Sequence, residues 1–198
     1  KTHMEATEKR SKTCCFSGHR ELPAEKVQQL AAEIEKAVRR LITKHGVCYF
    51  GVGGAIGFDT LVAKVLFRMR KSEFPQIKVI LVYPFDGYTR WWTREQKREY
   101  RMLLPKYDKV VCVVDQGGKE AYLLRNRHLV EGSSYCIYYC TRKEGGTAYT
   151  VSYAKARGLH MFALRVREKR QYPRNCNRYR IRSQQKRKHR SDLLCRRR

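Results

Sequence analysis

The chain has 198 residues, enough for one domain with a full hydrophobic core, and it carries a formal net charge of +26. Residues 167–198 hold 14 lysines and arginines against 2 acids, which leaves +14 on residues 1–166, so both parts favour polyanionic partners. No apolar run reaches membrane-spanning length, so we expect no membrane partner, and the eight cysteines lack Cys-x-x-Cys or zinc-finger spacing. We therefore expect reduced thiols in a cytoplasmic protein without a metal site.

Residues 1–12 precede the first apolar segment. Lys1, Thr2 and His3 stand before Met4 and resemble the remnant of an expression tag. No signal-peptide pattern of basic, apolar and small residues follows them. We expect residues 1–12 to form a flexible N-terminal segment.

From Thr13 to Arg165 the apolar segments alternate between the periods of strands and helices. The predicted strands are Thr13–Ser17, Val47–Gly51, Ile77–Tyr83, Lys109–Asp115, Tyr135–Cys140 and His160–Leu164. The predicted helices lie between Pro23 and Gly46 and at Phe58–Lys71, Thr93–Leu104, Ala121–Glu131 and Ala148–Arg157. Nearly continuous apolar strands favour a parallel sheet buried on both faces. Residues 13–166 are thus predicted to be an α/β, Rossmann-like three-layer sandwich with a mostly parallel sheet.

Two glycine turns stand between a predicted strand and a predicted helix: Gly53, Gly54, Ala55 and Gly57 in the first, and Gly145, Gly146 and Thr147 in the second. Backbone N–H groups in such turns converge with the unpaired N–H groups of the helix start and bind phosphate. Glycines in these places also permit tight packing of a strand against a helix. Thr147 would donate to phosphate or cap its helix.

Further candidates lie where predicted strands end, because ligands bind beyond the carboxyl ends of parallel strands. Gly18, His19 and Arg20 follow the first strand, and 84–86 follow the third. Arg20 would hold phosphate and His19 would stack on or hydrogen-bond a base. The alternative is a solvated surface pair.

Three polar residues on predicted helices also have two interpretations. Asp59 would contact a ribose hydroxyl or cap its helix. Arg125 and Asn126 would hydrogen-bond the ligand, or Arg125 would pair with a local acid such as Glu120. A nucleotide-type ligand is therefore expected, with no catalytic residue assigned.

Aromatic and basic residues outside these motifs are compatible with nucleic acid. One of Trp91 and Trp92 would cover the core, while an indole in that loop could stack on a base. The arginine-rich segment 167–198, with Tyr172 and Tyr179, is expected to be disordered alone. It would bind RNA or DNA backbones, or serve only as a solubilising extension.

Four segments together resemble one protein family: 14–20, 53–63, 125–133 and 145–154. Taken in order they are similar to the YpsA-like branch of the SLOG superfamily, which is named after the DprA/Smf and LOG proteins. The resemblance runs from about Thr13 to Leu164. It implies a Rossmann-like fold and a nucleotide-derived ligand, and no settled enzymatic activity.

Two relatives in that superfamily imply different functions. LOG phosphoribohydrolases carry a catalytic glutamate soon after the second glycine turn, whereas Ala148, Tyr149, Thr150 and Val151 stand there in this chain. DprA-like proteins, which bind single-stranded DNA, have a glycine turn similar to 54–59.

The sequence therefore predicts binding of a nucleotide or nucleotide-derived ligand, such as AMP, NAD or ADP-ribose, by a sensor or sequestering module. The alternative is binding of single-stranded DNA or RNA by the basic surface and the tail. A third hypothesis is weak N-glycosidase activity on nucleoside monophosphates, with Asp86 or Glu144 replacing the missing acid. A homodimer is left open.

Overall fold

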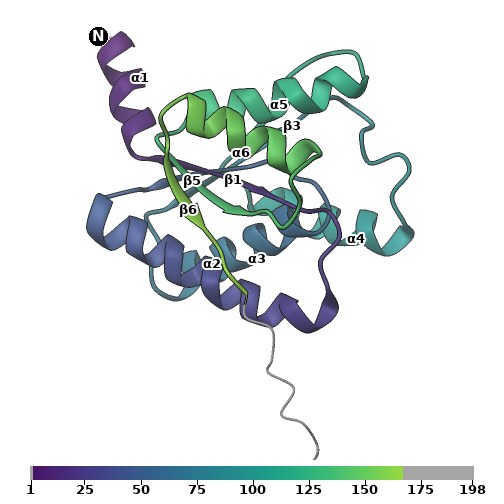
Figure 1. Ribbon diagram of the computed structural model, residues 1–198, viewed down its shortest axis with the longest axis horizontal. Coiled ribbons are helices and arrows are strands. Elements are labelled where there is room, and N and C mark those ends of the chain that lie inside the picture. Colours follow the sequence, from purple (N-terminus) through teal and green to yellow (C-terminus); the bar gives the residue numbers. More distant parts are fainter. Residues whose placement is uncertain (1, 167–198) are drawn as a thin grey trace, which may run out of the picture. The chain divides into compact units, whose positions relative to one another are not determined.

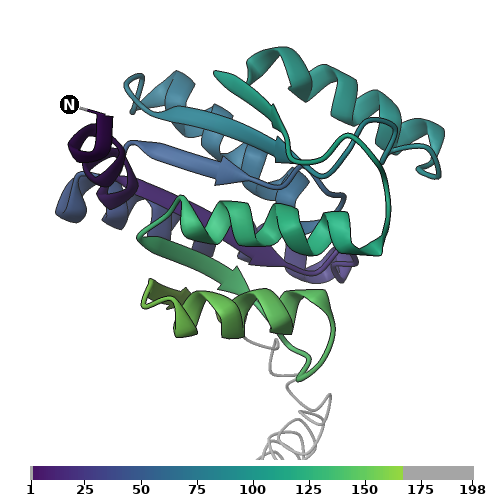
Figure 2. The ribbon, with the colours of Figure 1, turned by 90° about the horizontal axis from the view of Figure 1, so that it is seen from above.

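Six parallel strands form one sheet at the centre of the computed structural model, which describes residues 2–166 and the side chains from residue 5 onward. The strands are β1 (Thr13–Gly18), β2 (Tyr49–Val52), β3 (Lys78–Tyr83), β4 (Lys109–Cys112), β5 (Tyr135–Tyr139) and β6 (His160–Ala163). Their order in the sheet is β4-β3-β2-β1-β5-β6, with all arrows pointing the same way (Figure 2). The predicted Rossmann-like α/β fold is confirmed, and the sheet is parallel throughout rather than mostly parallel.

Helices cover both faces of the sheet and complete the three layers (Figure 1). One face carries α2 (Ala24–His45), α3 (Phe58–Ser72), α4 (Arg94–Leu103) and the short 3-10 helix η1 (Leu104–Lys106). The other face carries α5 (Lys119–Glu131) and α6 (Gly146–Ala156). Each β-α-β connection therefore crosses over the sheet, as parallel strands require.

The hydrophobic periodicity of α2 explains its place in the core. Leu30, Ile34, Val38 and Leu41 recur at helical spacing and are all fully buried. The helix ends at Gly46, whose φ of 66° lets its N–H bond back to the Ile42 carbonyl. The larger of the two apolar clusters lies on this face, between α2, α3 and the sheet.

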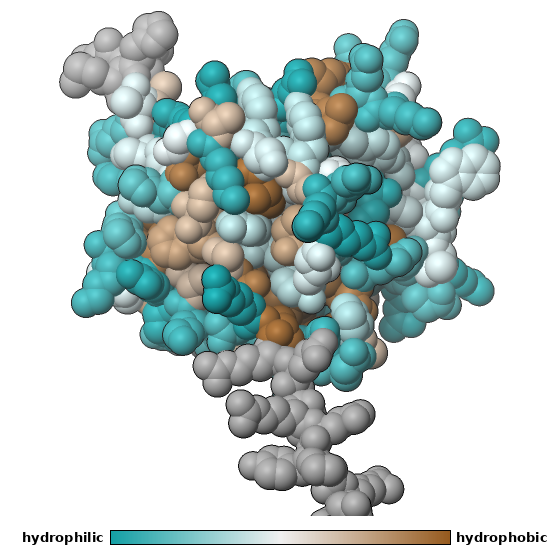
Figure 3. All heavy atoms as spheres, viewed as in Figure 1, coloured by the Kyte–Doolittle hydropathy of each residue, from teal (hydrophilic) through white to brown (hydrophobic). Residues whose placement is uncertain are grey.

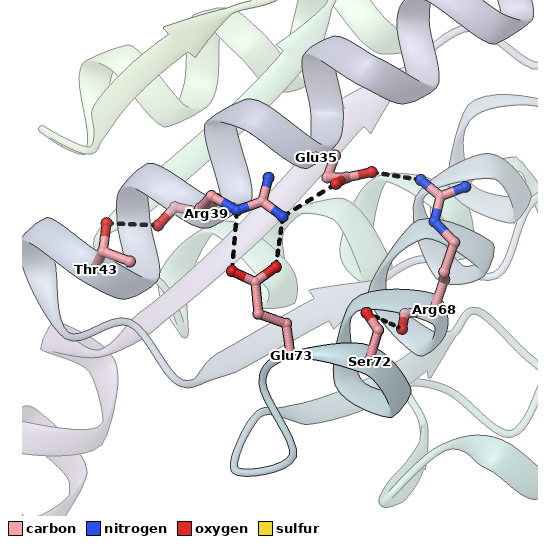
Figure 4. Close-up of polar contacts among 6 residues, drawn as sticks. All are labelled: Glu35, Arg39, Thr43, Arg68, Ser72 and Glu73. Carbon is pink, nitrogen blue, oxygen red and sulfur yellow. Dashed lines mark hydrogen bonds and ion pairs between the residues drawn. The ribbon is translucent and has the colours of Figure 1, made fainter.

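Ion pairs join the exposed sides of α2 and α3 (Figure 4). Arg39 binds Glu73 at 2.6 Å and Glu35 at 3.1 Å. Glu35 also accepts from Arg68 at 2.6 Å. These contacts lower the pKa of both glutamates, chiefly through hydrogen bonds from the arginines. Hydrophilic side chains likewise cover most of the face seen in Figure 3.

The N-terminal segment, which we predicted to be flexible, is helical over most of its length. Residues Thr2–Ser11 form a helix, α1. Arg10 Nε donates to the Glu131 carbonyl at 2.9 Å, and the Lys9 ammonium lies over the Tyr49 ring at 4.9 Å from its centroid. These contacts are polar and reach elements far along the chain, so hydrophobic periodicity could not predict them.

Strand β4 departs from the expectation of strands buried on both faces. It lies at the edge of the sheet and is mostly exposed, including Cys112. Cys48 and Cys136 also stand in predicted strands. Cys136 is buried and Cys48 is half-buried. An apolar run indicates that a strand forms, but it does not show where the strand lies in the sheet. That position depends on the direction in which each crossover connection runs. The predicted basic tail, residues 167–198, lies outside the described residues.

Candidate functional site

The order of the sheet reverses at β1, which has β2 on one side and β5 on the other. The connections after β1 and β5 therefore lead to opposite faces and leave a crevice at the carboxyl edge. A pocket of about 410 Å³ lies there. Ten of the predicted residues line it, namely Gly18, His19, Arg20, Ala55, Asp59, Arg125, Asn126, Gly145, Gly146 and Thr147.

The first glycine turn mainly serves packing. A Cβ on Gly53 would lie 2.0 Å from the Arg125 guanidinium, and one on Gly57 would lie 2.1 Å from the Arg20 carbonyl oxygen. Gly54 has a φ of +66°, and a Cβ there would lie 2.4 Å from the Leu81 side chain. Tight packing thus accounts for all three glycines, none of which lines the pocket.

A buried ion pair connects this turn to α5. Asp59 Oδ2 lies 3.6 Å from Arg125 and accepts from the Ala55 N–H at 3.1 Å. Arg125 also donates to the Gly53 carbonyl. Burial raises the pKa of Asp59, although the nearby Arg125 cation opposes that effect. Arg125 therefore pairs with Asp59 rather than with Glu120, and Asp59 closes its own turn rather than capping α3.

Arg125 retains one unused donor. The side chain is only 6 % exposed, and its Nε lacks a hydrogen-bond partner within residues 2–166. A buried donor without a partner costs free energy, so such a group commonly faces a ligand or a water molecule. Arg125 also lines the pocket, although its Nε is itself enclosed by protein atoms.

The loop after β1 is held by its neighbours. The His19 carbonyl accepts from Phe58 N–H at 3.0 Å, and its ring Nε2 accepts from Thr141 N–H at 2.9 Å. Burial lowers the pKa of His19, and the Arg142 charge adds to that effect. Arg20 lies over the Tyr122 ring, 5.0 Å from its centroid. His19 is half-buried and hydrogen-bonded, whereas Arg20 is exposed and contacts the Tyr122 ring.

The second glycine turn is open. Gly145 has a φ of +98° and precedes α6, and a Cβ built on either Gly145 or Gly146 would meet nothing within 4 Å. Thr147 donates its hydroxyl to the Gly18 carbonyl at 3.0 Å, and Asn126 donates its amide to Thr150 at 2.8 Å. These bonds tie α6 to β1 and α5, while Gly145, Gly146 and Thr147 at the start of α6 line the pocket.

Tyr122 and Arg142 are among the residues that line the pocket and that sequence reasoning missed. Tyr122 stands three residues before Arg125, so helical spacing could have placed both on one face. Arg142 lies in the loop after β5, where no periodicity points to a site. Of the two acids considered for glycosidase chemistry, Glu144 lines the pocket and Asp86 does not.

The two tryptophans separate clearly. Trp92 packs edge-to-face against Tyr88 and Tyr100, with ring centroids 5.4 Å and 5.7 Å apart. Trp91 is 86 % exposed. The Trp92 ring is therefore the one that covers the core.

Within residues 2–166, no helix has the length and apolar composition needed to cross a membrane. No group of three or more His, Cys, Asp or Glu side chains in the same range is placed to hold a metal ion.

A family model described as the YspA SLOG family (YpsA) matches residues 15–167, which is most of the chain. The chain belongs to this SLOG family. The predicted resemblance to the YpsA-like branch is thereby confirmed, and the matched region contains both glycine turns and every residue of the pocket described above.

Curated relatives of this SLOG protein are UPF0398 proteins of bacilli. One from Shouchella clausii is 26 % identical over 133 residues, which is 66 % of this chain and 70 % of the relative. One from Bacillus thuringiensis strain Al Hakam is 27 % identical over 131 residues, covering 63 % of this chain and 71 % of the relative.

Two solved structures share the SLOG protein's fold. DNA processing protein A from Helicobacter pylori, described with a single-stranded DNA binding mode, has a TM-score of 0.57 at 15 % identity, covering 82 % of this chain and 69 % of that one. DprA from Streptococcus pneumoniae has a TM-score of 0.58 at 19 % identity, covering 86 % and 56 %. The likeness shows a common Rossmann-like architecture.

Proposed function

We propose that this SLOG protein binds a nucleotide-derived ligand in the pocket between β1 and β5, with the ligand's phosphate at the start of α6. The observation that carries this proposal is the open second glycine turn facing the pocket. Unpaired N–H groups and the positive end of the helix dipole attract an anion there.

The surrounding side chains fit such a ligand. Arg20, Arg125 and Arg142 line the same pocket, and guanidinium groups form paired hydrogen bonds with phosphate oxygens. Asp59, at the other side of the pocket, would accept from a ribose hydroxyl through its second oxygen. The volume of about 410 Å³ falls within the range of small-molecule sites, roughly 300–1,000 Å³.

A matched pair of glycine substitutions tests the phosphate position. Gly146→Asp places a carboxylate at the start of α6, and Gly118→Asp places one at the start of α5, outside the pocket. Neither new Cβ would meet an atom within 4 Å, so both variants should fold.

Calorimetric titration of the full chain with AMP, NAD and ADP-ribose measures the outcome. We expect saturable binding of at least one of them by the wild type and by Gly118→Asp, and its loss in Gly146→Asp through repulsion between carboxylate and phosphate. Equal binding by all three proteins would exclude the start of α6 as the phosphate site. No binding up to millimolar concentration would refute the proposed function.

A second candidate function is binding of single-stranded nucleic acid. Its specific support is the charge of +14 on residues 1–166 in addition to the basic segment 167–198. The DprA neighbour from Helicobacter pylori, which shares the fold, is described with single-stranded DNA. Titration of the full chain with an oligonucleotide at several salt concentrations tests this function, because each phosphate contact releases counterions. Absent or salt-insensitive binding would refute it.

A further inference from the structure

Trp91 is an exposed ring with no role in the core. At 86 % exposure it is the most exposed of the large hydrophobic side chains in residues 5–166. It lies in the loop between β3 and α4, at the carboxyl edge of the sheet. An indole left in water at such a position calls for a physical reason, since its burial would favour folding.

The loop that carries Trp91 is fixed on both sides. Tyr88 is buried, and its hydroxyl donates to the Gly54 carbonyl at 3.0 Å. On the other side Trp92 packs against Tyr88 and Tyr100, and Thr93 forms a capping box with Gln96 at the start of α4. The exposure of Trp91 therefore results from a rigid loop that presents the ring, not from a slack segment.

One cationic side chain contacts the ring, and three more follow on the next helix. The Arg90 guanidinium lies over it, 5.0 Å from the ring centroid. Arg94, Arg98 and Arg101 follow on α4 at spacings of four and three residues, and all three are exposed. Such spacing places them along one side of the helix. Of the two acids on α4, Glu99 pairs with Lys64 on α3, and Glu95 is exposed.

We propose that Trp91 stacks on an unpaired base of a single-stranded nucleic acid, with the arginine stripe of α4 (Arg94, Arg98 and Arg101) contacting its phosphates. An isolated ring of this kind can reach the face of a base only when the strand is unpaired. The arginines supply charge complementarity to the phosphate backbone. This inference rests on the second candidate function and assigns it a position on the molecule.

Affinity for a fluorescein-labelled oligo(dT) of about 15 nucleotides, a length that fits typical single-strand sites, tests the assignment in the full chain. We expect Trp91→Ala to weaken binding about 5- to 100-fold, the range for loss of one stacked base. Trp91→Phe should keep most of the affinity, because phenylalanine retains a stacking face. Met102→Ala, which also shortens an exposed apolar side chain, is the matched control and should bind as the wild type does.

Salt dependence and fluorescence separate stacking from charge. Trp91→Ala should leave the salt slope unchanged, whereas Arg94→Ala and Arg98→Ala should each reduce it by about one phosphate contact. In Trp92→Phe, where Trp91 is the remaining tryptophan, oligo(dT) should quench the emission.

Three outcomes would overturn the assignment. If Trp91→Ala binds oligo(dT) as the wild type does while the arginine variants weaken it, nucleic-acid binding stands and the stacking role of Trp91 fails. If the wild type does not bind oligo(dT), both fail. If anionic phosphatidylserine vesicles, but not oligo(dT), change the Trp91 emission, the loop is a membrane-surface contact instead.

Discussion

At the residue scale, the Asp59–Arg125 pair is the feature that links the first glycine turn to the pocket. Both side chains are buried, so each charge depends on the other for compensation. We expect Asp59→Asn to lower the free energy of unfolding by about 3 kcal/mol, because it leaves Arg125 buried without its charge partner. Urea unfolding measures the change.

The control is the double variant Asp59→Asn with Arg125→Met, which removes the orphaned cation as well. It should be more stable than Asp59→Asn alone. A double variant as unstable as the sum of both single variants would mean that the two residues act independently.

The two glycine turns predict opposite responses to alanine. Gly57→Ala would force a Cβ onto the Arg20 carbonyl at a φ of +77°, so we expect a loss of about 2–4 kcal/mol. Gly146→Ala faces open space at the start of a helix and should change stability by less than about 1 kcal/mol. Urea midpoints of the two variants, compared with the wild type, check this. Equal losses would contradict the packing assigned to the first turn.

His19 makes stability depend on pH. Burial holds its folded-state pKa below the ordinary value of about 6.5, so the folded state binds fewer protons than the unfolded chain. The stability that neutral His19 contributes to the folded state is therefore complete above about pH 6.5. It is lost as the pH falls through the lower folded-state pKa.

The variant His19→Gln isolates this effect, because its amide oxygen can still accept from Thr141 but does not titrate. Between about pH 7 and about pH 5, the urea midpoint of the wild type should fall more than that of His19→Gln. Parallel curves would show that His19 does not carry the pH dependence.

At the scale of elements, the ion pairs between α2 and α3 should contribute little. Arg39 and Glu73 are both substantially exposed, so solvent screens their attraction. We expect Arg39→Ala to cost about 0.5–1 kcal/mol, which thermal unfolding would detect as a small decrease in Tm. Lys36→Ala, at an exposed position of the same helix, is the control and should be close to neutral.

Helix α6 matters more for the proposed site than for the hydrophobic core. It contributes little to the core beyond Val151 and Ala154, yet its first turn is where we propose that the ligand's phosphate binds. Hydrogen bonds from Thr147 to β1 and from Asn126 to Thr150 fix its start. Its position therefore follows from polar contacts with β1 and α5 rather than from a strong apolar face.

At the scale of the whole molecule, two kinds of anion should respond differently to salt. A mononucleotide in the pocket meets a few fixed donors, whereas a single strand displaces counterions along its length. Raising the salt concentration from about 50 to about 200 mM should weaken oligonucleotide binding by at least tenfold and AMP binding much less. An equally steep salt dependence for both would place AMP on the general basic surface.

From β1 to β6, the sequence by itself determined the strands, the α-helices and their order. Strand and helix periods are local, so α2 could be read from the spacing of Leu30, Ile34 and Val38, and each glycine turn from its place between strand and helix. Parallel strands then put the loops after β1, β2 and β5 at one edge without further information. This reasoning predicted that most of the candidate residues lie close together, as they do in the pocket.

Only the tertiary structure decided which of those residues are packed and which are open. The space where a Cβ would lie on Gly53, Gly54 or Gly57 is occupied by Arg125, Leu81 and Arg20, respectively, which are distant in the chain. At Gly145 and Gly146 the same space is open. The partner of Asp59, the polar docking of α1 and the choice between Trp91 and Trp92 likewise depend on contacts between distant segments. Local periodicity carries no information about such contacts, because they arise only when the crossovers bring the segments together.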